Sequence, residues 1–198
     1  MIFDDNQTLS GQTPLDADEL KDLIPGHIQL ISELNQFESQ NILEAQKKYL
    51  QGRRLHFPLG NPEFLKRIHK DMFDHTWRWA GQYRKSDKNL GVDWWKIPEE
   101  VKKLCDNFSY WKENGTYPPI EMAVRLHHRL VFIHPFPNGN GRHARLVADI
   151  FVREVGEKTL TWGSGNLFKK TPDRKLYIAA LQKADSGDFK SLIRFAQS

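Results

Sequence analysis

Apolar residues recur at intervals of three and four along most of this 198-residue chain, which is the period of an amphipathic α-helix. The pattern is clearest over residues 62–81, 98–115 and 119–133, and it returns after residue 140. Residues 82–98 differ, because β-forming residues at both ends enclose a polar centre, which predicts an exposed hairpin or loop. The sequence therefore predicts a mainly α fold: a helical bundle with one small β-hairpin.

The length suits one ordinary domain with a short appendage. Residues 1–14 are polar and rich in turn formers, which predicts a loose leader. Residues 15–60 show helical periodicity interrupted by a proline and a glycine, so we expect N-terminal helices there. The remaining residues, 61–198, are predicted to form the core domain.

The composition is that of a globular protein, with 39% hydrophobic and 27% charged residues. The single cysteine, Cys105, excludes an internal disulfide and a multi-cysteine metal site. No run of 18 apolar residues suggests a membrane span, and the N-terminus lacks a secretory pattern. We therefore expect a cytoplasmic protein without a membrane partner. A net charge of +4 is mild and gives little reason to expect DNA binding.

The stretch HPFPNGNGRHAR, residues 134–145, lies between two helical patterns. Pro135 and Pro137 resist helix, so the first helix must end near His134. Gly139 and Gly141 carry no Cβ, so the chain can turn sharply and approach a ligand closely. The first amides of the following helix point outward without partners, which is a ready site for an anion.

Two arginines follow on the same helix. Arg142 and Arg145 are three residues apart and so share a face, and guanidinium groups bind phosphate oxygens through two hydrogen bonds. His134 has an ordinary pKa near neutrality and can act as a general base. Together these residues predict a polyphosphate site at which a phosphorus-containing group is transferred to a hydroxyl. The Walker and dinucleotide-binding glycine patterns do not fit this stretch.

The stretch resembles the motif HPFx[D/E]GNGRxxR of the Fic (Fido) family. Eight of the nine specified positions match, and they are His134, Pro135, Phe136, Gly139, Asn140, Gly141, Arg142 and Arg145. Within the family the chain is most similar to the bacterial subgroup called mobile mystery protein B. The resemblance implies the Fic fold over 61–198, with the hairpin as its flap.

The resemblance also implies an activity, which is AMP transfer from ATP to a Ser, Thr or Tyr hydroxyl of a target protein. His134 would deprotonate the hydroxyl, and Phe136 would anchor the loop. The α- and β-phosphates would be held by loop amides and the Asn140 side chain, and the β- and γ-phosphates by arginines. The nucleotide-binding set is thus Gly139, Asn140, Gly141, Arg142 and Arg145.

One position departs from the motif. The family's acidic residue, which usually carries Mg²⁺, is Asn138 here, although asparagine is usual in the subgroup. An amide oxygen can coordinate a metal but brings no charge. We therefore expect a weakened site for Mg²⁺ or Mn²⁺ at Asn138.

Two further elements follow from the resemblance. The flap corresponds to about residues 82–93, where Leu90, Gly91 and Val92 would bind the target segment by main-chain pairing. Many members are restrained by a helix reading [S/T]xxxE[G/N], whose glutamate pairs with the second arginine of the motif. Glu33 is the candidate, although Gln29 and Leu34 depart from that pattern, and Glu38 and Glu44 compete with it.

Alternatives stay open. The chain could be a nucleotide-binding regulator without transfer activity, which Asn138 favours, or it could transfer a different phosphorus-containing group. A homodimer is compatible with the resemblance. The histidines His127, His128 and His143 lack the carboxylate spacing of a metal site and are expected to support the core.

Overall fold

The computed structural model describes residues 20–28, 30–52, 56–163 and 171–198. The predicted leader at 1–14 lies outside these residues. The described elements are helices joined by loops, and their order is α2 (Ile31–Leu50), α3 (Pro62–Phe73), the short 3₁₀ helix η1 (Trp94–Lys96), α4 (Ile97–Asn114), α5 (Pro119–Ile133), α6 (Asn140–Val155), α7 (Pro172–Asp185) and α8 (Lys190–Ala196). The fold is therefore mainly helical, as the periodicity predicts.

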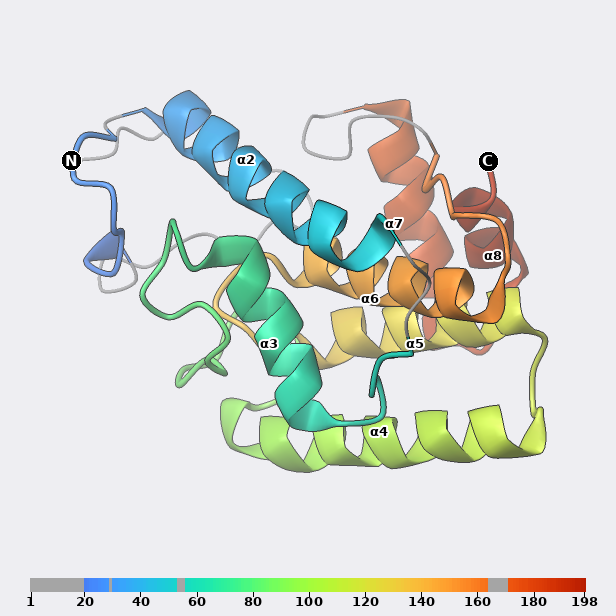
Figure 1. Ribbon diagram of the computed structural model, residues 1–198. Coiled ribbons are helices and arrows are strands. Elements are labelled where there is room, and N and C mark those ends of the chain that lie inside the picture. The colour runs from blue at the N-terminus through green and yellow to red at the C-terminus, as the bar shows by residue number, and fades with distance from the viewer. Residues whose placement is uncertain (1–19, 29, 53–55, 164–170) are drawn as a thin grey trace.

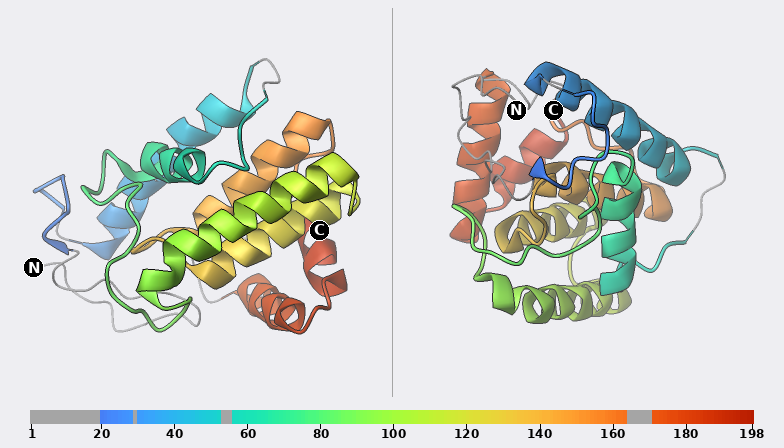
Figure 2. Two further views of the ribbon diagram at one scale, coloured as in Figure 1. Left: turned by 90° about the horizontal axis from the view of Figure 1, so that it is seen from below. Right: turned by 90° about the vertical axis from the view of Figure 1, so that its left-hand side faces the viewer.

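Helices α5 and α6 form the centre of the molecule (Figures 1 and 2). They pack closely on each other, and the other helices surround them. Leu126, Val147 and Phe151 are among their residues that water does not reach. Because both helices are held by this core, the loop that joins them is fixed at both ends.

The helix ends follow local chemistry. The Asn61 side chain accepts a hydrogen bond from the Glu63 amide and caps α3, and Gly115 and Gly156 end α4 and α6 in the left-handed conformation. The pattern at 62–81 predicts a longer helix than forms. Helix α3 stops at Phe73, and the chain turns back on itself.

Gly81 explains this return. A Cβ at Gly81 would lie 2.9 Å from the Lys66 carbonyl oxygen of α3, so the close approach requires a glycine. Trp77 lies between the end of α3 and Gly81 in the sequence. Its backbone forms an isolated β-bridge with Leu23, and its side chain is fully buried. The second half of the apolar pattern is therefore buried as turns and not as helix.

Helix α2 lies across α3 and α6. Asn41 fixes it to the end of α3, because its amide donates to the Asp71 carbonyl (3.3 Å) and its oxygen accepts from the His75 amide (3.1 Å). Tyr49 adds a hydrogen bond to the Asp71 carboxylate. One face of α2 is thus held against the core.

The flap, residues 82–93, is an irregular loop with bends. Of the two forms expected, hairpin or loop, the loop is the one that forms. The buried Arg84 side chain supplies the hydrogen bonds that a second strand would otherwise make. Its guanidinium donates to the carbonyls of Ser86 and Val92, both within the loop, and to that of His134. A side chain at the centre, and not a ladder of backbone bonds, holds this segment together.

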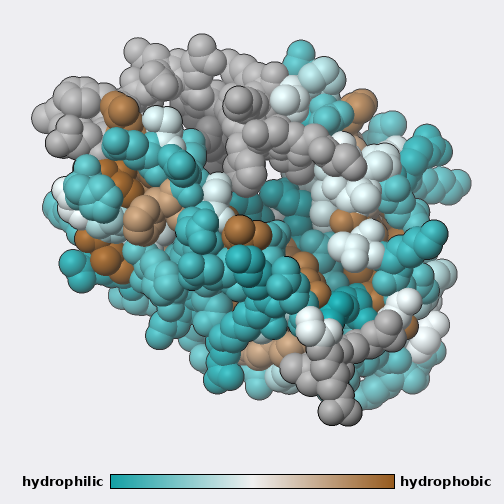
Figure 3. Space-filling view, turned by 45° about the horizontal axis from the view of Figure 1, so that its top comes forward, coloured by the Kyte–Doolittle hydropathy of each residue, from teal (hydrophilic) through white to brown (hydrophobic). Residues whose placement is uncertain are grey.

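No helix among the described residues has both the length and the apolar character needed to cross a membrane. The face that carries α2 and α7 is mostly hydrophilic and is hollowed near its middle, and its apolar residues lie in small separate groups (Figure 3).

Candidate functional site

His134 ends α5 and begins the candidate site. Its backbone is left-handed, with φ 54° and ψ 58°, which is uncommon for a residue with a side chain. The strain is held in place because the buried Arg84 donates from Nε to the His134 carbonyl at 2.7 Å. Gly91 packs directly on the start of this side chain, since a Cβ at Gly91 would lie 2.5 Å from the His134 Cβ. The flap therefore fixes the direction of this histidine.

The His134 side chain is neutral at neutral pH. Burial and the nearby Arg84 cation lower its pKa from 6.5 to about 4. A neutral imidazole can accept a proton. A phosphate anion beside it would raise the pKa again and favour the protonated product of such a transfer.

Phe136 anchors the loop in the core and is 1% exposed. Asn140 closes the loop around it, because the Phe136 amide donates to Asn140 Oδ1 (2.9 Å) and Asn140 Nδ2 donates to the Phe136 carbonyl (2.8 Å). The structure thus gives the Asn140 side chain a role inside the loop, where the resemblance implied a phosphate contact. Its backbone amide is still in the first turn of α6.

His69 ties the loop to the base of the flap. Its Nε2 donates to the Asn138 carbonyl (3.1 Å), and its Nδ1 accepts from the Gly81 amide (3.0 Å). The ring stacks on Phe136 with centroids 3.7 Å apart. Burial lowers its pKa well below 6.5, so it stays neutral. Sequence reasoning missed His69. A histidine on the apolar face of the helix at 62–73 indicates a buried polar group, which needs a hydrogen-bond partner.

Gly139 marks the start of α6. Its φ is 76°, and a Cβ there would lie 2.4 Å from the Phe73 ring. Only glycine fits this turn, which brings the first amides of α6 to the surface of the loop. Arg142 and Arg145 then follow on the first two turns of the helix, as their spacing predicts.

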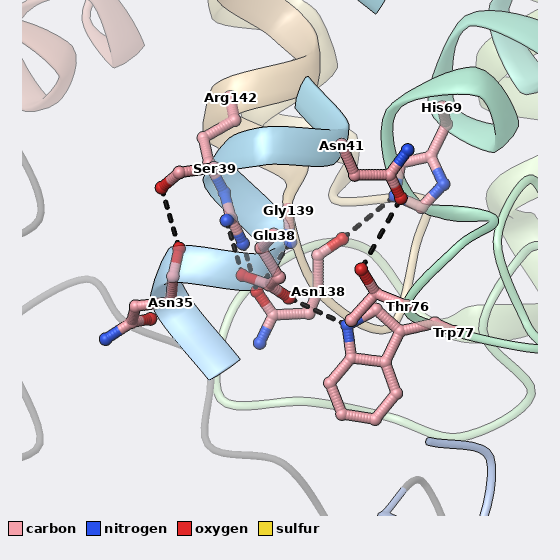
Figure 4. Close-up of polar contacts among 10 residues, drawn as sticks. All are labelled: Asn35, Glu38, Ser39, Asn41, His69, Thr76, Trp77, Asn138, Gly139 and Arg142. Carbon is pink, nitrogen blue, oxygen red and sulfur yellow. Dashed lines mark hydrogen bonds and ion pairs between the residues drawn. The ribbon is translucent and has the colours of Figure 1, made fainter. Parts of the chain in front are cut away.

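Arg142 is paired with a glutamate of α2, and this glutamate is Glu38. Arg142 Nη1 lies 2.5 Å from Glu38 Oε2, and Trp77 Nε1 donates to the other carboxylate oxygen at 2.7 Å. Figure 4 shows Glu38 pointing from α2 toward both partners. Glu33, the candidate from the sequence, accepts from the Leu30 amide in the first turn of α2.

Asn138 gives a divalent metal ion a poor ligand set. Its side-chain oxygen accepts from the Gly139 amide (2.6 Å) and from Arg142 Nη2 (3.3 Å), so two donors already engage it. Among the described residues, no group of three or more His, Cys, Asp or Glu side chains could hold a metal. The described residues around the loop therefore do not fit a resident Mg²⁺ or Mn²⁺ ion.

The flap residues expected to bind a target lie at the surface. Leu90 is 40% exposed, Gly91 is exposed and Val92 is half-buried. The Val92 amide donates to the Ile133 carbonyl at 3.3 Å, so part of this backbone is already paired. Beside the base of the flap is a pocket of about 440 Å³. None of its lining residues belongs to the loop at 134–139. They are Lys66, Gly81, Gln82, Tyr83, Arg84, Lys85, Trp94, Trp95 and Pro98.

Fold and site together define a class: helical proteins that place a histidine and two arginines around a loop leading into a helix N-terminus. The comparison with family models agrees, since residues 58–152 match the Fic/DOC family. This part of the chain is a Fic family domain.

Curated relatives carry the same domain. Protein adenylyltransferase Fic of Nematostella vectensis is 32% identical over 132 residues, which are 65% of this chain and 29% of that protein. The protein of the same name from Aedes aegypti is 30% identical over 119 residues, or 59% of this chain and 22% of the relative. The chain thus spans less than a third of the length of these relatives.

Solved structures share the fold. BepC of Bartonella tribocorum, solved with bound AMPPNP, superposes with a TM-score of 0.65 at 18% identity, over 92% of this chain and 97% of that one. Fic-1 of C. elegans superposes with a TM-score of 0.59 at 23% identity, over 90% of this chain and 51% of that one. These likenesses establish the Fic fold.

The buried histidines generate a prediction on acid stability. Their pKa values are lowered in the folded state, to about 4 for His134 and His143, so below pH 6.5 the unfolded chain binds more protons and is favoured by acidification. We expect the free energy of unfolding in urea to fall as the pH drops from 6.5 to 4.5. Each such group contributes at most about 1.4 kcal/mol per pH unit. The histidines are His69, His127, His128, His134 and His143.

A variant sharpens this test. Burial raises the pKa of Asp149 to about 7, so this group opposes the loss by binding a proton in the folded state. Asp149→Asn keeps the oxygen that accepts from Trp162 Nε1 and should make the loss steeper. A free energy of unfolding that stays constant or rises on acidification would contradict the prediction.

Proposed function

We propose that this protein transfers AMP from ATP to a hydroxyl side chain of a target protein. The observation that carries the proposal is the site itself: a buried, neutral His134 at the start of a loop that leads into the N-terminus of α6, with Arg142 and Arg145 beside it. The match to the Fic/DOC family and the relatives named adenylyltransferases support AMP as the transferred group.

The chemistry follows from these roles. A ring nitrogen of His134 takes the proton of the target hydroxyl. The hydroxyl oxygen forms a bond to the α-phosphorus, the bond from that phosphorus to the bridging oxygen breaks, and pyrophosphate leaves with the electron pair. The amides of Gly139, Asn140 and Gly141 hold the α- and β-phosphates, and the Gly139 amide exchanges Asn138 Oδ1 for a phosphate oxygen. The arginines hold the β- and γ-phosphates.

The nucleotide arrives as its Mg²⁺ or Mn²⁺ complex, and the ion belongs to the substrate. Asn138 offers this ion one neutral oxygen, so the phosphates hold it. The target presents a Ser, Thr or Tyr hydroxyl, and its segment lies along the flap at Leu90, Gly91 and Val92. The motif, with its asparagine at 138, also supports a bacterial protein of the mobile mystery protein B subgroup.

His134→Ala tests the transfer step. We expect it to bind ATP as the wild type does and to lose AMP transfer by at least about 100-fold, since a general base contributes that much or more. The measurement is labelling of lysate proteins by α-³²P ATP, together with calorimetric ATP binding. His75→Ala is the matched control, because this exposed histidine lies outside the site.

The outcomes separate two functions. Equal labelling by His134→Ala and the wild type would contradict the role of His134. ATP binding with no labelled protein from the wild type would instead support a nucleotide-binding regulator. Asn138 and the engaged Arg142 favour this second function.

We further propose that α2 restrains the site through Glu38. The ion pair between Glu38 and Arg142 occupies the guanidinium that would otherwise bind phosphate. A nucleotide must therefore displace Glu38, which is 5% exposed and held by Trp77. We assign this restraint to Glu38, one of the candidates that compete with Glu33, and its partner is the first arginine of the motif.

Glu38→Gln tests this restraint. The substitution removes the charge that competes with phosphate but keeps an oxygen for Trp77. We expect ATP to bind at least about 10-fold more tightly, because the phosphates no longer compete with a carboxylate. A 10-fold gain in affinity corresponds to about 1.4 kcal/mol of binding free energy. Glu33→Gln is the matched control on the same helix and should bind ATP as the wild type does. A larger gain from Glu33→Gln than from Glu38→Gln would assign the restraint to Glu33.

Asn138→Asp tests the metal assignment. A carboxylate adds a hard anionic ligand and also a negative charge beside the phosphates. We expect the variant to bind ATP more tightly than the wild type in Mg²⁺ and more weakly in EDTA, each by several fold. Calorimetric titration of both proteins under both conditions measures this. If the two proteins bind ATP with the same affinity in Mg²⁺ and also with the same affinity in EDTA, position 138 does not face the ion.

A further inference from the structure

Helix α7 places a tyrosine beside the second arginine of the loop. The Tyr177 side chain is 6% exposed, and it lies close enough to the Arg145 guanidinium for each group to shift the pKa of the other. The Arg145 Cζ lies 5.9 Å from the Tyr177 ring centroid. The two residues are 32 positions apart in the sequence, so no motif around the loop includes Tyr177.

This pair faces the first turn of α6. An added Cβ at Gly141 would lie 3.7 Å from Arg145 Nη1 and 3.9 Å from the Tyr177 hydroxyl. These distances are ordinary contacts, so both polar groups line the space directly above Gly141. The same space lies over the outward amides of the helix N-terminus, where an anion binds.

The hydroxyl has a hydrogen-bond partner, His127 of α5. His127 Nε2 lies 3.0 Å from the Tyr177 oxygen. This bond fixes the hydroxyl on the side of α5. The Arg145 guanidinium lies over the Tyr177 ring, so side chains from α5, α6 and α7 meet at Tyr177.

Packing on the side away from Arg145 holds His127 and Tyr177 in place. The His127 ring packs on the Trp162 ring with centroids 4.4 Å apart, and Trp162 Nε1 donates to Asp149 at 3.0 Å. Trp162 itself has a left-handed backbone, with φ 52°, a conformation that persists only where the surroundings impose it. Tyr177 packs on Phe195 of α8. The position of the phenol is therefore fixed from behind.

We propose that Tyr177 is a positioning residue for Arg145, and that α7 forms a wall of the site for the terminal phosphates of a nucleotide. With its hydroxyl fixed by His127, Tyr177 holds the guanidinium above the first amides of α6. A guanidinium held this way loses little freedom when the anion binds, which raises affinity for a polyphosphate. The inference rests on the proposed function, because it assigns ATP to this site.

Tyr177→Phe tests the inference in the full chain, because it keeps the ring and removes the hydroxyl. We expect ATP to bind about 3- to 10-fold more weakly, the effect of losing one hydrogen bond. AMP lacks the terminal phosphates and should bind as it does to the wild type. Calorimetric titrations with ATP and AMP measure both. Tyr110→Phe on α4 is the matched control, since Tyr110 is 61% exposed, and it should change neither affinity.

A double-mutant cycle shows whether Tyr177 acts through Arg145. In an Arg145→Ala background, Tyr177→Phe should weaken ATP binding no further. Equal losses of ATP and AMP affinity, or a loss that persists without Arg145, would show a general structural effect and overturn the inference. ATP binding unchanged by Tyr177→Phe would also overturn it. Absence of ATP binding by the wild type would overturn the proposed function itself.

Discussion

The site depends on one constraint, which is that a chain reversal between two buried helices must satisfy its own polar backbone. The loop at 134–139 turns inside the core, where an unpaired amide or carbonyl is costly. Side chains supply the missing partners: Asn140 pairs with Phe136, His69 with the Asn138 carbonyl, and Arg84 with the His134 carbonyl. Each partner comes from a different part of the chain. The loop is therefore rigid before any ligand arrives, which lowers the cost of binding one.

The charges around the loop follow from the same burial. Arg84 lies behind His134, and it helps to keep the imidazole neutral and therefore able to accept a proton. Arg142 lies in front of the loop and is balanced by Glu38. Arg145 lies beside Tyr177 and near Asp149. Two of the three cations are thus held in advance by groups that a phosphate does not need to displace, and only Arg142 must exchange one anion for another. This difference is why the proposed restraint concerns a single arginine.

The sequence predicts the parts of this site that lie close together along the chain. The loop, its glycines and both arginines follow from residues 134–145 alone, because the helix period and the missing Cβ atoms act locally. The partners from elsewhere could not be predicted in this way. His69, Arg84 and Tyr177 reach the loop only through tertiary packing, and a hydrogen bond between distant residues leaves no spacing in the sequence. The flap shows the same limit, since β-forming residues at 82–98 predict strands, whereas the Arg84 side chain bonds to the carbonyls within a loop.

The helical period places Glu38, and not Glu33, on the face of α2 that packs on the core. Leu34, Glu38, Asn41, Ala45 and Tyr49 are all buried, and their spacings of four, three, four and four residues place them on one face of the helix. Glu33 lies five residues before Glu38, which is a rotation of about 140° around an α-helix. It is exposed and caps the first turn through Leu30. A carboxylate of α2 can reach Arg142 only from the face that packs on α6. Glu38 lies on that face and Glu33 does not, so the spacing of the buried residues identifies Glu38 without reference to its neighbours in the sequence.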